Sequence, residues 1–429
     1  MAKPTIRFKG YTEDWEQRKV TELLKNSSSA MKIGPFGSAL KKEYFVDEGI
    51  KVYAQENAFT GDFSIGDYYI TEDKYKELQS CELYPGDLVI SMMGTIGACA
   101  IFPENAEKGI MNSHLLRLQF DNEVIPKYIM YLLRDSDLIR KQIDRLSVGS
   151  IMSGLSSSVV KKLVFPIPTL AEQKRIVEYL DSLNNLITLH QRKCEETKIL
   201  KKYMLQKMFP QNGQKVPEIR FKGFTEDWEQ RKSGELVKEG ILEAPLDGNH
   251  GEKHPTSDEY VDSGIPFLMA SDIHDGEVNI YSCKYITKER AERLDKGFAR
   301  NGDVLLTHKA TIGETAILSN LMTEYAMLTP QVTYYRIKNE ERLNREYLYS
   351  FFNSLDFQTE LKTKAAQSTR PYIGITAQQN LKIILPAEID EQRKIGLYFR
   401  NLDYLITLHQ RKYEELKNIK KFMLQNMFV

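Results

Sequence analysis

Apolar side chains recur at alternating intervals of four and three residues along one long stretch of the chain. The series begins at Ile176 and continues through Leu180, Leu183, Ile187, His190, Cys194, Thr197, Lys201, Met204 and Met208. This spacing forms a heptad seam, which is typical of helices that pair as coiled coils. Because residues 172–209 contain neither glycine nor proline, the pattern predicts a single helix about 57 Å long.

The same seam returns near the C-terminal end, as Ile395, Phe399, Leu402, Ile406, His409, Tyr413, Leu416, Lys420, Met423 and Met427. The octapeptide at residues 186–193 is repeated without change at 405–412. Each apolar stripe needs a partner, so we expect the two helices to pair in one register, set by the His and Lys positions of the seam. The alternative is that each helix packs only on its own domain. One histidine in each helix is a weak indication of a metal site, so none is assigned there.

A polar segment around a tryptophan is also repeated. Residues 6–10 recur at 219–223, and residues 12–19 recur at 225–232. Trp15 and Trp228 are the only two tryptophans of the chain. The segment is either a docking strap, with its tryptophan buried against a helix end or a partner protein, or an N-terminal cap of each domain.

The residues between these repeats show short strand patterns bounded by turn signals. In the first half the expected strands are 50–54, 87–92, 98–102 and 115–120, followed by a helical stretch at 126–146, a Ser/Gly loop at 147–154 and a last strand at 160–167. Thr169 and Glu172 have the spacing of a capping box at the start of the long helix. After a linker at 210–218 the second half repeats this order, with a helical stretch at 344–366, a loop at 367–374 and a strand containing Pro386.

The two halves differ in how closely they match. The long helices and the tryptophan segments are nearly identical, whereas the bodies share only strand starts and turns, such as 85–90 with 301–306 and 95–97 with 311–313. The two bodies are thus expected to share one fold and to carry different surfaces, on helices and tryptophan segments that are nearly identical. This is expected of a protein that recognises two different targets with one scaffold.

Composition limits the function classes. The chain has 429 residues with 59 Lys and Arg against 59 Asp and Glu, so overall charge gives no argument for nucleic acid and any DNA-binding face must be local. Its 4 cysteines show no C-x-x-C spacing, which fits a reducing cytoplasm and no zinc ribbon. The N-terminus is not a signal peptide, and no run of 18 apolar residues occurs, so no membrane span is expected.

The sequence contains no recognised catalytic motif. The chain contains no P-loop, no Rossmann fingerprint, and no Asn/Asp-Pro-Pro-aromatic tetrapeptide of the kind that an amino-methyltransferase acting on a base would need. His250 and His254 have the spacing of metal ligands on a helix. The neighbouring Gly251 and Pro255 favour a polar contact loop instead, so no catalytic residue and no metal ligand is assigned.

These features resemble the specificity (S) subunit of type I restriction-modification systems. The resemblance rests on the proline exit with Glu-Gln-x-x-Ile at 166–176 and 386–395, on the Lys-rich helix ending in Met-Leu-Gln-x-Met-Phe, and on the Gly-Asp…Thr-Ile-Gly turn of each half. It covers nearly the whole chain. It implies an α+β fold in which two similar target recognition domains are separated by two long helices forming an antiparallel coiled coil, with an internal pseudo-twofold repeat.

The expected domains follow from that resemblance. They are a first target recognition domain with its N-terminal strap at 1–168, a first spacer helix at 169–209, a linker and repeated strap at 210–232, a second target recognition domain at 233–388 and a second spacer helix at 389–429.

The resemblance also implies a function. The chain would be a non-catalytic, cytoplasmic DNA sequence reader that binds double-stranded DNA, two methyltransferase (modification) subunits and restriction/motor subunits, with S-adenosylmethionine and ATP held by those partners. A helical spacer of this length could hold two readers one DNA turn apart, about 34 Å, and two unlike bodies predict an asymmetric bipartite target. The rival hypothesis is a non-catalytic coiled-coil scaffold that joins two protein partners, and a third is an enzyme with an unrecognised site.

Residues that touch DNA should be polar or basic and lie in loops, because base edges and phosphates are read by such groups. In the first body the candidates are Lys32, Ser38, Lys41, Lys42, Gln55, Asn57, Thr95, Ser150 and Ser153. In the second body they are His250, Lys253, His254, Ser271, Asp272, His308, Lys309, Thr311, Thr369, Arg370 and Tyr372. The candidates for partner binding are Trp15, Trp228, Leu189, Leu408, Tyr203 and Phe422.

Overall fold

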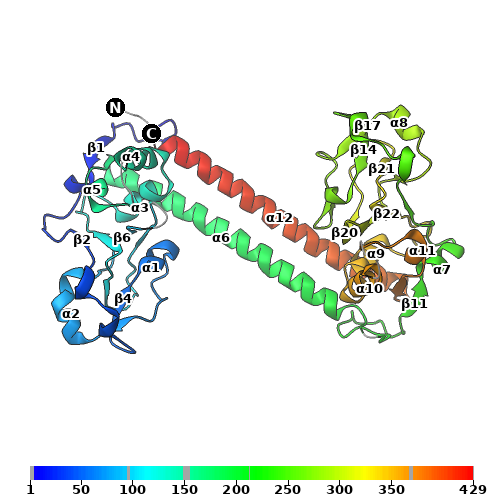
Figure 1. The fold of residues 1–429 in the computed structure, drawn as a ribbon, viewed down its shortest axis with the longest axis horizontal. Coiled ribbons are helices and arrows are strands. Elements are labelled where there is room, and N and C mark those ends of the chain that lie inside the picture. The colour runs from blue at the N-terminus through cyan, green and yellow to red at the C-terminus, as the bar shows by residue number, and fades with distance from the viewer. Residues whose placement is uncertain (1–3, 94–96, 148–154, 212, 367–370, 429) are drawn as a thin grey trace. The chain divides into compact units, whose positions relative to one another are not determined.

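The computed structural model describes residues 4–93, 97–147, 155–211, 213–366 and 371–428. The chain forms two compact units, the first of Met1–Leu189 with Lys412–Val429 and the second of His190–Arg411. Each unit contains a body of helices and strands together with one end of each long helix (Figure 1).

The body of the first unit contains two four-stranded sheets, ordered β2-β9-β6-β7 and β3-β5-β4-β8, and a separate pair of β1 with β10. The strands are β1 Glu16–Lys19, β2 Met31–Ile33, β3 Phe45–Val46, β4 Ile50–Tyr53, β5 Tyr69–Ile70, β6 Leu88–Ser91, β7 Cys99–Ile101, β8 Gly109–Met111, β9 Leu115–Leu118 and β10 Val164–Ile167. The helices are α1 Gln55–Thr60, α2 Glu72–Leu78, α3 Pro126–Asp135, α4 Asp137–Leu146, α5 Ser157–Val160 and the long α6 Leu170–Lys207, with 3₁₀ turns η1 Val20–Glu22, η2 Gly37–Ala39, η3 Lys42–Tyr44 and η4 Gln79–Cys81.

The body of the second unit repeats this plan with sheets ordered β12-β22-β19-β20 and β13-β17-β14-β21-β18, and with the pairs β11-β23 and β15-β16. The strands are β11 Glu229–Lys232, β12 Leu246–Asp247, β13 Tyr260–Val261, β14 Ile265–Leu268, β15 Ile273–His274, β16 Glu277–Val278, β17 Lys284–Ile286, β18 Phe298–Ala299, β19 Val304–Lys309, β20 Thr311–Ile317, β21 Ala326–Leu328, β22 Val332–Tyr335 and β23 Lys382–Leu385. The helices are α7 Ser233–Lys238, α8 Lys288–Glu292, α9 Arg345–Phe352, α10 Leu355–Ala365, α11 Ile375–Gln379 and the long α12 Ile389–Met427, with 3₁₀ turns η5 Gly251–Lys253, η6 Ser257–Glu259 and η7 Ala270–Asp272.

The predicted strands at 50–54, 87–92, 98–102 and 115–120 are confirmed as β4, β6, β7 and β9. The helical stretches 126–146 and 344–366 are each two helices, broken after Asp135 and Phe352. The prediction of a strand from residue 160 is wrong at its start. Val160 ends the short helix α5, which Ser156 caps by accepting a hydrogen bond from the Val159 amide.

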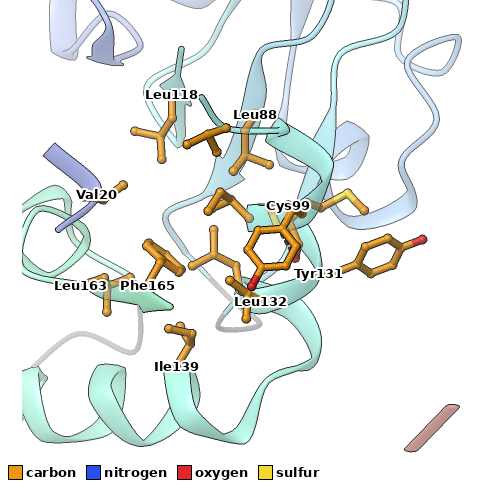
Figure 2. Packing of buried hydrophobic residues seen from close by; sticks show 14 of the residues in the cluster. Val20, Leu88, Cys99, Leu118, Tyr131, Leu132, Ile139, Leu163 and Phe165 are labelled. Atoms are coloured by element: carbon orange, nitrogen blue, oxygen red, sulfur yellow. Dashed lines mark hydrogen bonds between the residues drawn. The ribbon is translucent and has the colours of Figure 1, made fainter. Parts of the chain in front are cut away.

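The hydrophobic core of the first unit lies between the β2-β9-β6-β7 sheet and the helices α3 and α4. Figure 2 shows part of this cluster, including Leu88, Leu118 and Leu132. The last turn of α12 belongs to the same cluster, and the ring of Phe428 packs edge-on against Tyr128 with centroids 5.9 Å apart. The second unit repeats this arrangement, because Phe209 after α6 lies 5.8 Å from the ring of Tyr347. The C-terminal end of each long helix is therefore anchored in a body core.

The long helices α6 and α12 pack against each other, as the heptad seam predicts, and the alternative of isolated packing is wrong. All the described seam residues are buried or half-buried. In the second unit Nδ1 of His190 lies 2.9 Å from Nδ1 of His409, and Lys201 Nζ lies 2.5 Å from an oxygen of Asp403. Lys201 follows His190 along α6, whereas Asp403 precedes His409 along α12, so the two helices are antiparallel.

The repeated tryptophan segment forms the strand that pairs with the last strand of each body, β1 with β10 and β11 with β23. Arg7 makes two hydrogen bonds of 2.7 Å to the carboxylate of Glu172 in the first turn of α6, and Trp15 Nε1 donates to the same carboxylate at 3.1 Å. The Glu172 amide bonds Thr169 Oγ1 at 3.4 Å. The Thr169 half of the capping box is therefore confirmed, whereas the Glu172 carboxylate is bound by the strap.

Candidate nucleic-acid interface

The first unit has a local basic surface beside the edge strand β2. Lys32 and Lys161 line a cavity of about 470 Å³, and Lys25 and Lys161 line an adjacent one of about 500 Å³. Within the described part of the chain no carboxylate forms an ion pair with any of the three ammonium groups. Unpaired lysines gathered on one face are suited to phosphate binding, although the net charge of the chain is zero.

The segment that follows β2 projects an aromatic side chain from this surface. Phe36 is 65% exposed and lines the same cavity as Lys32 and Lys161. Of the predicted contact residues, Ser38, Lys41 and Lys42 follow in this segment and are exposed. Phe36, Lys25 and Lys161 are not among the residues predicted from the sequence. The turn Gly-Pro-Phe-Gly at 34–37 was the available signal for Phe36, since glycines around one aromatic residue leave it little to pack against.

The second unit has a segment of the same form after β12. Gly34 and Gly248 occupy equivalent positions, since a Cβ on either would lie within 2 Å of a backbone oxygen, 1.9 Å from Asn112 and 1.8 Å from Leu328. A 3₁₀ turn follows in both, beginning at Gly37 with φ +55° and at Gly251 with φ +63°. The two segments therefore share a backbone path and differ in their side chains.

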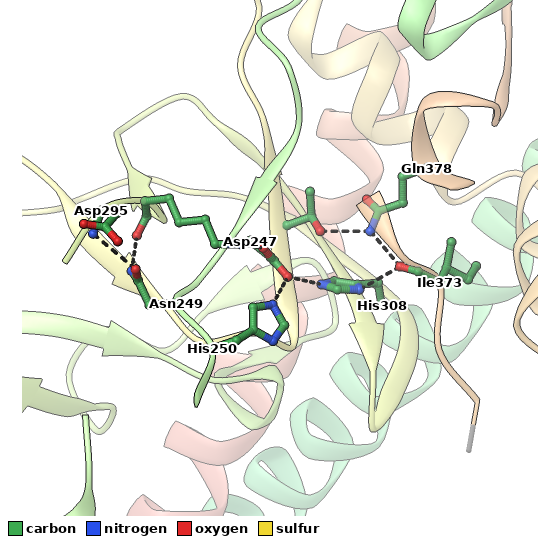
Figure 3. Close-up of polar contacts among 9 residues, drawn as sticks. Asp247, Asn249, His250, Asp295, His308, Ile373 and Gln378 are labelled. Carbon is green, nitrogen blue, oxygen red and sulfur yellow. Dashed lines mark hydrogen bonds and ion pairs between the residues drawn. The ribbon is translucent and has the colours of Figure 1, made fainter. Parts of the chain in front are cut away.

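A buried carboxylate organises the second segment (Figure 3). Asp247, 1% exposed, binds Nε2 of His250 at 2.8 Å and the ammonium group of Lys296. The register of the edge strands places Ile33 at the position of Asp247, because the two residues pair with Leu116 and Thr333 at the same point of the sheet. A polar cluster in the second unit thus replaces an apolar position in the first.

His308 lies behind this cluster and is fully buried. Its Nδ1 bonds the carbonyl oxygen of Ile373 at 2.9 Å, which requires Nδ1 to donate, and its Nε2 lies 4.0 Å from Asp247. Burial lowers the pKa of His308 to about 4, so the imidazole is neutral near pH 7. The prediction that His308 contacts DNA is wrong, because the side chain has no exposed surface.

The hairpin of β19 and β20 brings other predicted residues together. Lys309 and Thr311 are exposed on either side of Ala310, which has φ +68°. Tyr372 is 38% exposed, pairs with Lys309 through a β-bridge and places its ring 5.6 Å from that of His308. Thr95, Ser150, Ser153, Thr369 and Arg370 lie outside the described residues.

The side chains of Asn57 and Asp272 both bind the backbone at the start of the turn that follows a strand. Asn57 is 2% exposed; its Oδ1 accepts from the Ala54 amide at 2.8 Å, and its Nδ2 donates to two loop carbonyls. Asp272 accepts from the Met269 amide at 2.7 Å. The prediction that Asn57 contacts DNA is wrong, because its side chain is buried and bound to the backbone. Asp272 is half-buried and only one of its carboxylate oxygens makes this bond, so its contact with DNA stays a prediction.

The remaining candidates in this region are held by neighbours to different degrees. Gln55 is half-buried, and its Nε2 lies 3.4 Å from Ser91 Oγ. Lys253 pairs with Asp295, whereas Ser271 is exposed. His254 packs against Phe267 with ring centroids 5.4 Å apart, and burial lowers its pKa. His250 and His254 thus face different neighbours, in agreement with the loop interpretation. The described residues contain no group of three or more potential metal ligands.

The partner-binding candidates divide into buried and exposed residues. Trp15 and Trp228 are each 3% exposed within their own units. The interpretation that each tryptophan is buried at a helix end is therefore confirmed, and the prediction that either indole contacts a partner protein is wrong. Leu189 and Leu408 are half-buried, whereas Tyr203 and Phe422 are 48% and 55% exposed.

Further exposed apolar side chains occur at positions that correspond between the helices. They are Leu186 and Leu405, 42% and 40% exposed, and Leu200 and Ile419, 43% and 37% exposed. With Phe422 and Tyr203 they form a first patch of Leu186, Ile419 and Phe422 and a second patch of Leu405, Leu200 and Tyr203, one in each unit. The exposed fractions at the repeated positions are similar, so the two patches are alike at these three positions. The second unit also exposes Ile199 and Tyr404, whose counterparts are Asn418 and Asn185.

Comparison with known proteins adds a family match. The sequence model described as the type I restriction modification DNA specificity domain matches residues 12–198 and 225–418. The chain is 24% identical to the type I restriction enzyme MjaVIII specificity subunit of Methanocaldococcus jannaschii, over 73% of this chain and 72% of that protein. It is also 24% identical to the type I restriction enzyme EcoBI specificity subunit of Escherichia coli, over 73% of this chain and 66% of that protein.

A solved structure has the same fold. The crystal structure of the S subunit of a type I restriction-modification system from M. genitalium matches 100% of this chain and 99% of its own, with a TM-score of 0.61 and 15% identity. Among the described residues, no helix is long and apolar enough to cross a membrane.

Proposed function

Because the chain belongs to the family of type I restriction modification DNA specificity domains, we propose that each of its units reads one half of an asymmetric bipartite DNA target. The relatives are named specificity subunits of type I restriction enzymes, and the family model is described as a DNA specificity domain. The chain therefore supplies recognition, and methyl transfer belongs to subunits that bind it.

One observation carries the proposal of an asymmetric target. The segments after β2 and β12 follow the same backbone path between equivalent glycines. They present different groups, with Phe36 and unpaired lysines in the first unit and His250 with its buried carboxylate in the second. Sequence is read by side chains at base edges, so two unlike sets of side chains favour two different half-sites.

Phosphate contacts would position each unit on the duplex. Lys25 and Lys161 are exposed and Lys32 is half-buried, and none of them is neutralised by a described carboxylate. Such contacts supply affinity and register but not sequence preference. They support DNA binding over the scaffold alternative, for which an unpaired basic face has no role.

The two apolar patches on the long helices support binding of two copies of one partner. Their residues correspond pairwise and are exposed to a similar extent, so each unit offers three matched apolar side chains to a partner. We assign these patches to two methyltransferase subunits, which would hold S-adenosylmethionine. Restriction/motor subunits that use ATP would join the resulting complex.

The test is a methylation map of the genome in cells that express this chain with its cognate methyltransferase subunit, compared with cells lacking this chain. We expect a split, asymmetric motif to lose its methyl marks when the chain is absent. An unchanged map, together with duplex affinity that does not depend on salt, would favour the coiled-coil scaffold instead.

A further inference from the structure

We propose that Phe36 and His250 are specificity-determining residues at equivalent positions of the two units, each reading one base of a different half-site. Phe36 makes an apolar contact with the methyl group of a thymine, and His250 accepts a hydrogen bond from the amino group of an adenine or a cytosine. The proposal rests on the proposed function and adds residues and base chemistry to it.

The equivalence of the two positions follows from the backbone. Phe36 and His250 each stand two residues after a glycine packed onto a backbone oxygen and one residue before a glycine with positive φ. The segments then run through two 3₁₀ turns to β3 or β13. A glycine with φ +153° follows each of these strands, Gly49 before β4 and Gly264 before β14. Both side chains therefore leave the same point of the same loop.

Phe36 is placed for contact with another molecule. Its side chain is 65% exposed, although the preceding Pro35 is buried and fixes the turn. The two lysines that share its cavity, Lys32 and Lys161, are free to hold phosphates. Phosphates held by these two lysines would place the Phe36 side chain at the major groove of the DNA. There the methyl group of thymine is the apolar feature that a phenylalanine can recognise.

The chemistry of His250 is set by Asp247. The Asp247 carboxylate only accepts hydrogen bonds, so Nε2 of His250, 2.8 Å away, carries the proton. In the uncharged form of this tautomer the lone pair is on Nδ1, for which the described residues provide no hydrogen-bond donor. The His250 side chain is 49% exposed. An exposed acceptor with a fixed tautomer selects a base that presents an amino group in the major groove, which adenine and cytosine do.

The ammonium group of Lys296 strengthens this arrangement. It pairs with Asp247, which is 1% exposed, and neutralises a carboxylate that would otherwise be buried without a cation. The charge of the Asp247 carboxylate is therefore balanced by Lys296. In the first unit the corresponding strand residue is Ile33, so Phe36 has no such support and presents only apolar surface.

The experiment uses the full chain in complex with its methyltransferase subunit. Methylation maps are compared for the wild type and for F36A, F36L and H250A. We expect F36A to relax by about tenfold the preference at one thymine of one half-site, and F36L to retain most of it. H250A should relax one adenine or cytosine position of the other half-site. Y281A is the matched control, because Tyr281 is an aromatic residue 82% exposed outside the loop.

The outcomes separate the two proposals. If the wild type directs no methylation, the proposed function fails. If the wild type directs methylation but F36A and H250A keep an unchanged motif, the assignment of base-reading residues fails while the function stands. An even loss of methylation at all target sites, with the motif unchanged, also overturns the assignment, because it would show that the loops serve assembly. The amount of complex recovered by size-exclusion chromatography identifies that case.

Discussion

Nδ1 of His190 lies 2.9 Å from Nδ1 of His409 in the seam between the long helices. The two residues occupy the same position of the repeated octapeptide, so the antiparallel pairing brings each copy onto the other. At this distance one Nδ1 donates and the other accepts, which fixes opposite tautomers in chemically identical residues. Protonation of both rings would remove the acceptor and place two cations side by side.

This contact predicts a pH-dependent stability of the helix pair. Burial, with smaller contributions from His190 and Lys193, lowers the pKa of His409 below its ordinary 6.5. The unfolded chain then binds more protons than the folded chain below that value, so the free energy of unfolding should fall as the pH drops through 6.5. Urea denaturation followed by circular dichroism at pH 7.5 and 5.5 measures this change. H190N/H409N should reduce the dependence, and an equal dependence in the variant would contradict the assignment.

The two tryptophans provide a matched pair for measuring one hydrogen bond. Trp15 Nε1 donates to Glu172, whereas Trp228 Nε1 is buried and has no hydrogen-bond partner among the described residues. Because a hydrogen bond to a charged group contributes about 1.5–3 kcal/mol, W15F should lower the free energy of unfolding by about that much more than W228F. Chemical denaturation of both variants is the measurement, and equal losses would show that the Trp15 bond contributes nothing.

The lysines of the first unit predict a change in salt dependence. If Lys25, Lys32 and Lys161 contact phosphates, each alanine variant should lower the slope of log affinity against log salt by about 0.9. Affinity should fall to a similar extent on target and non-target duplexes. Fluorescence anisotropy of the methyltransferase complex over a salt series provides the slope. K76A is the control, since Lys76 is exposed but pairs with Asp73; an unchanged slope in all three variants would remove them from the interface.

The apolar patches predict the stoichiometry of partner binding. Tyr203 and Phe422 belong to different patches and different units. A buried charge in an apolar contact has a high desolvation cost, so Y203D and F422D should each lose one methyltransferase subunit and the double variant should lose both. Native mass spectrometry counts the bound copies. Retention of two copies by the double variant would place the docking surface elsewhere.

Much of the frame could be predicted from the sequence. The heptad seam predicts α6 and α12 because an apolar stripe of period 3.5 has to be covered, and the repeated octapeptide indicates what covers it. The repeated strap was predicted as a unit, but its two interpretations were separated only by the structure, in which Glu172 accepts bonds from Arg7 and Trp15. Local patterns therefore predict elements, and they leave open which distant residue completes a contact.

The candidate interface was predicted less well, for a physical reason. A polar residue in a loop looks the same in sequence whether it faces solvent or caps a turn. Asn57 is therefore predicted to contact DNA, although its side chain is buried and binds a backbone amide three residues earlier. His308 was misassigned because its burial depends on Ile373, 65 residues away along the chain. Conversely, Phe36 is not among the predicted residues, because the exposure of an aromatic side chain depends on which distant residues pack against it. The Gly-Pro-Phe-Gly turn is only an indirect local signal of that exposure.

The sequence by itself determined the internal repeat, the two long helices and the family resemblance. These features depend on periodicity and on exact repetition within short stretches. Only the tertiary structure decided which side chains remain accessible. The edge strands and the glycines packed onto Asn112 and Leu328 place Phe36 and His250 at the same point of two loops, and Asp247 sets the tautomer of one of them. Accessibility and tautomer depend on contacts between residues far apart in the chain, and such contacts exist only after folding.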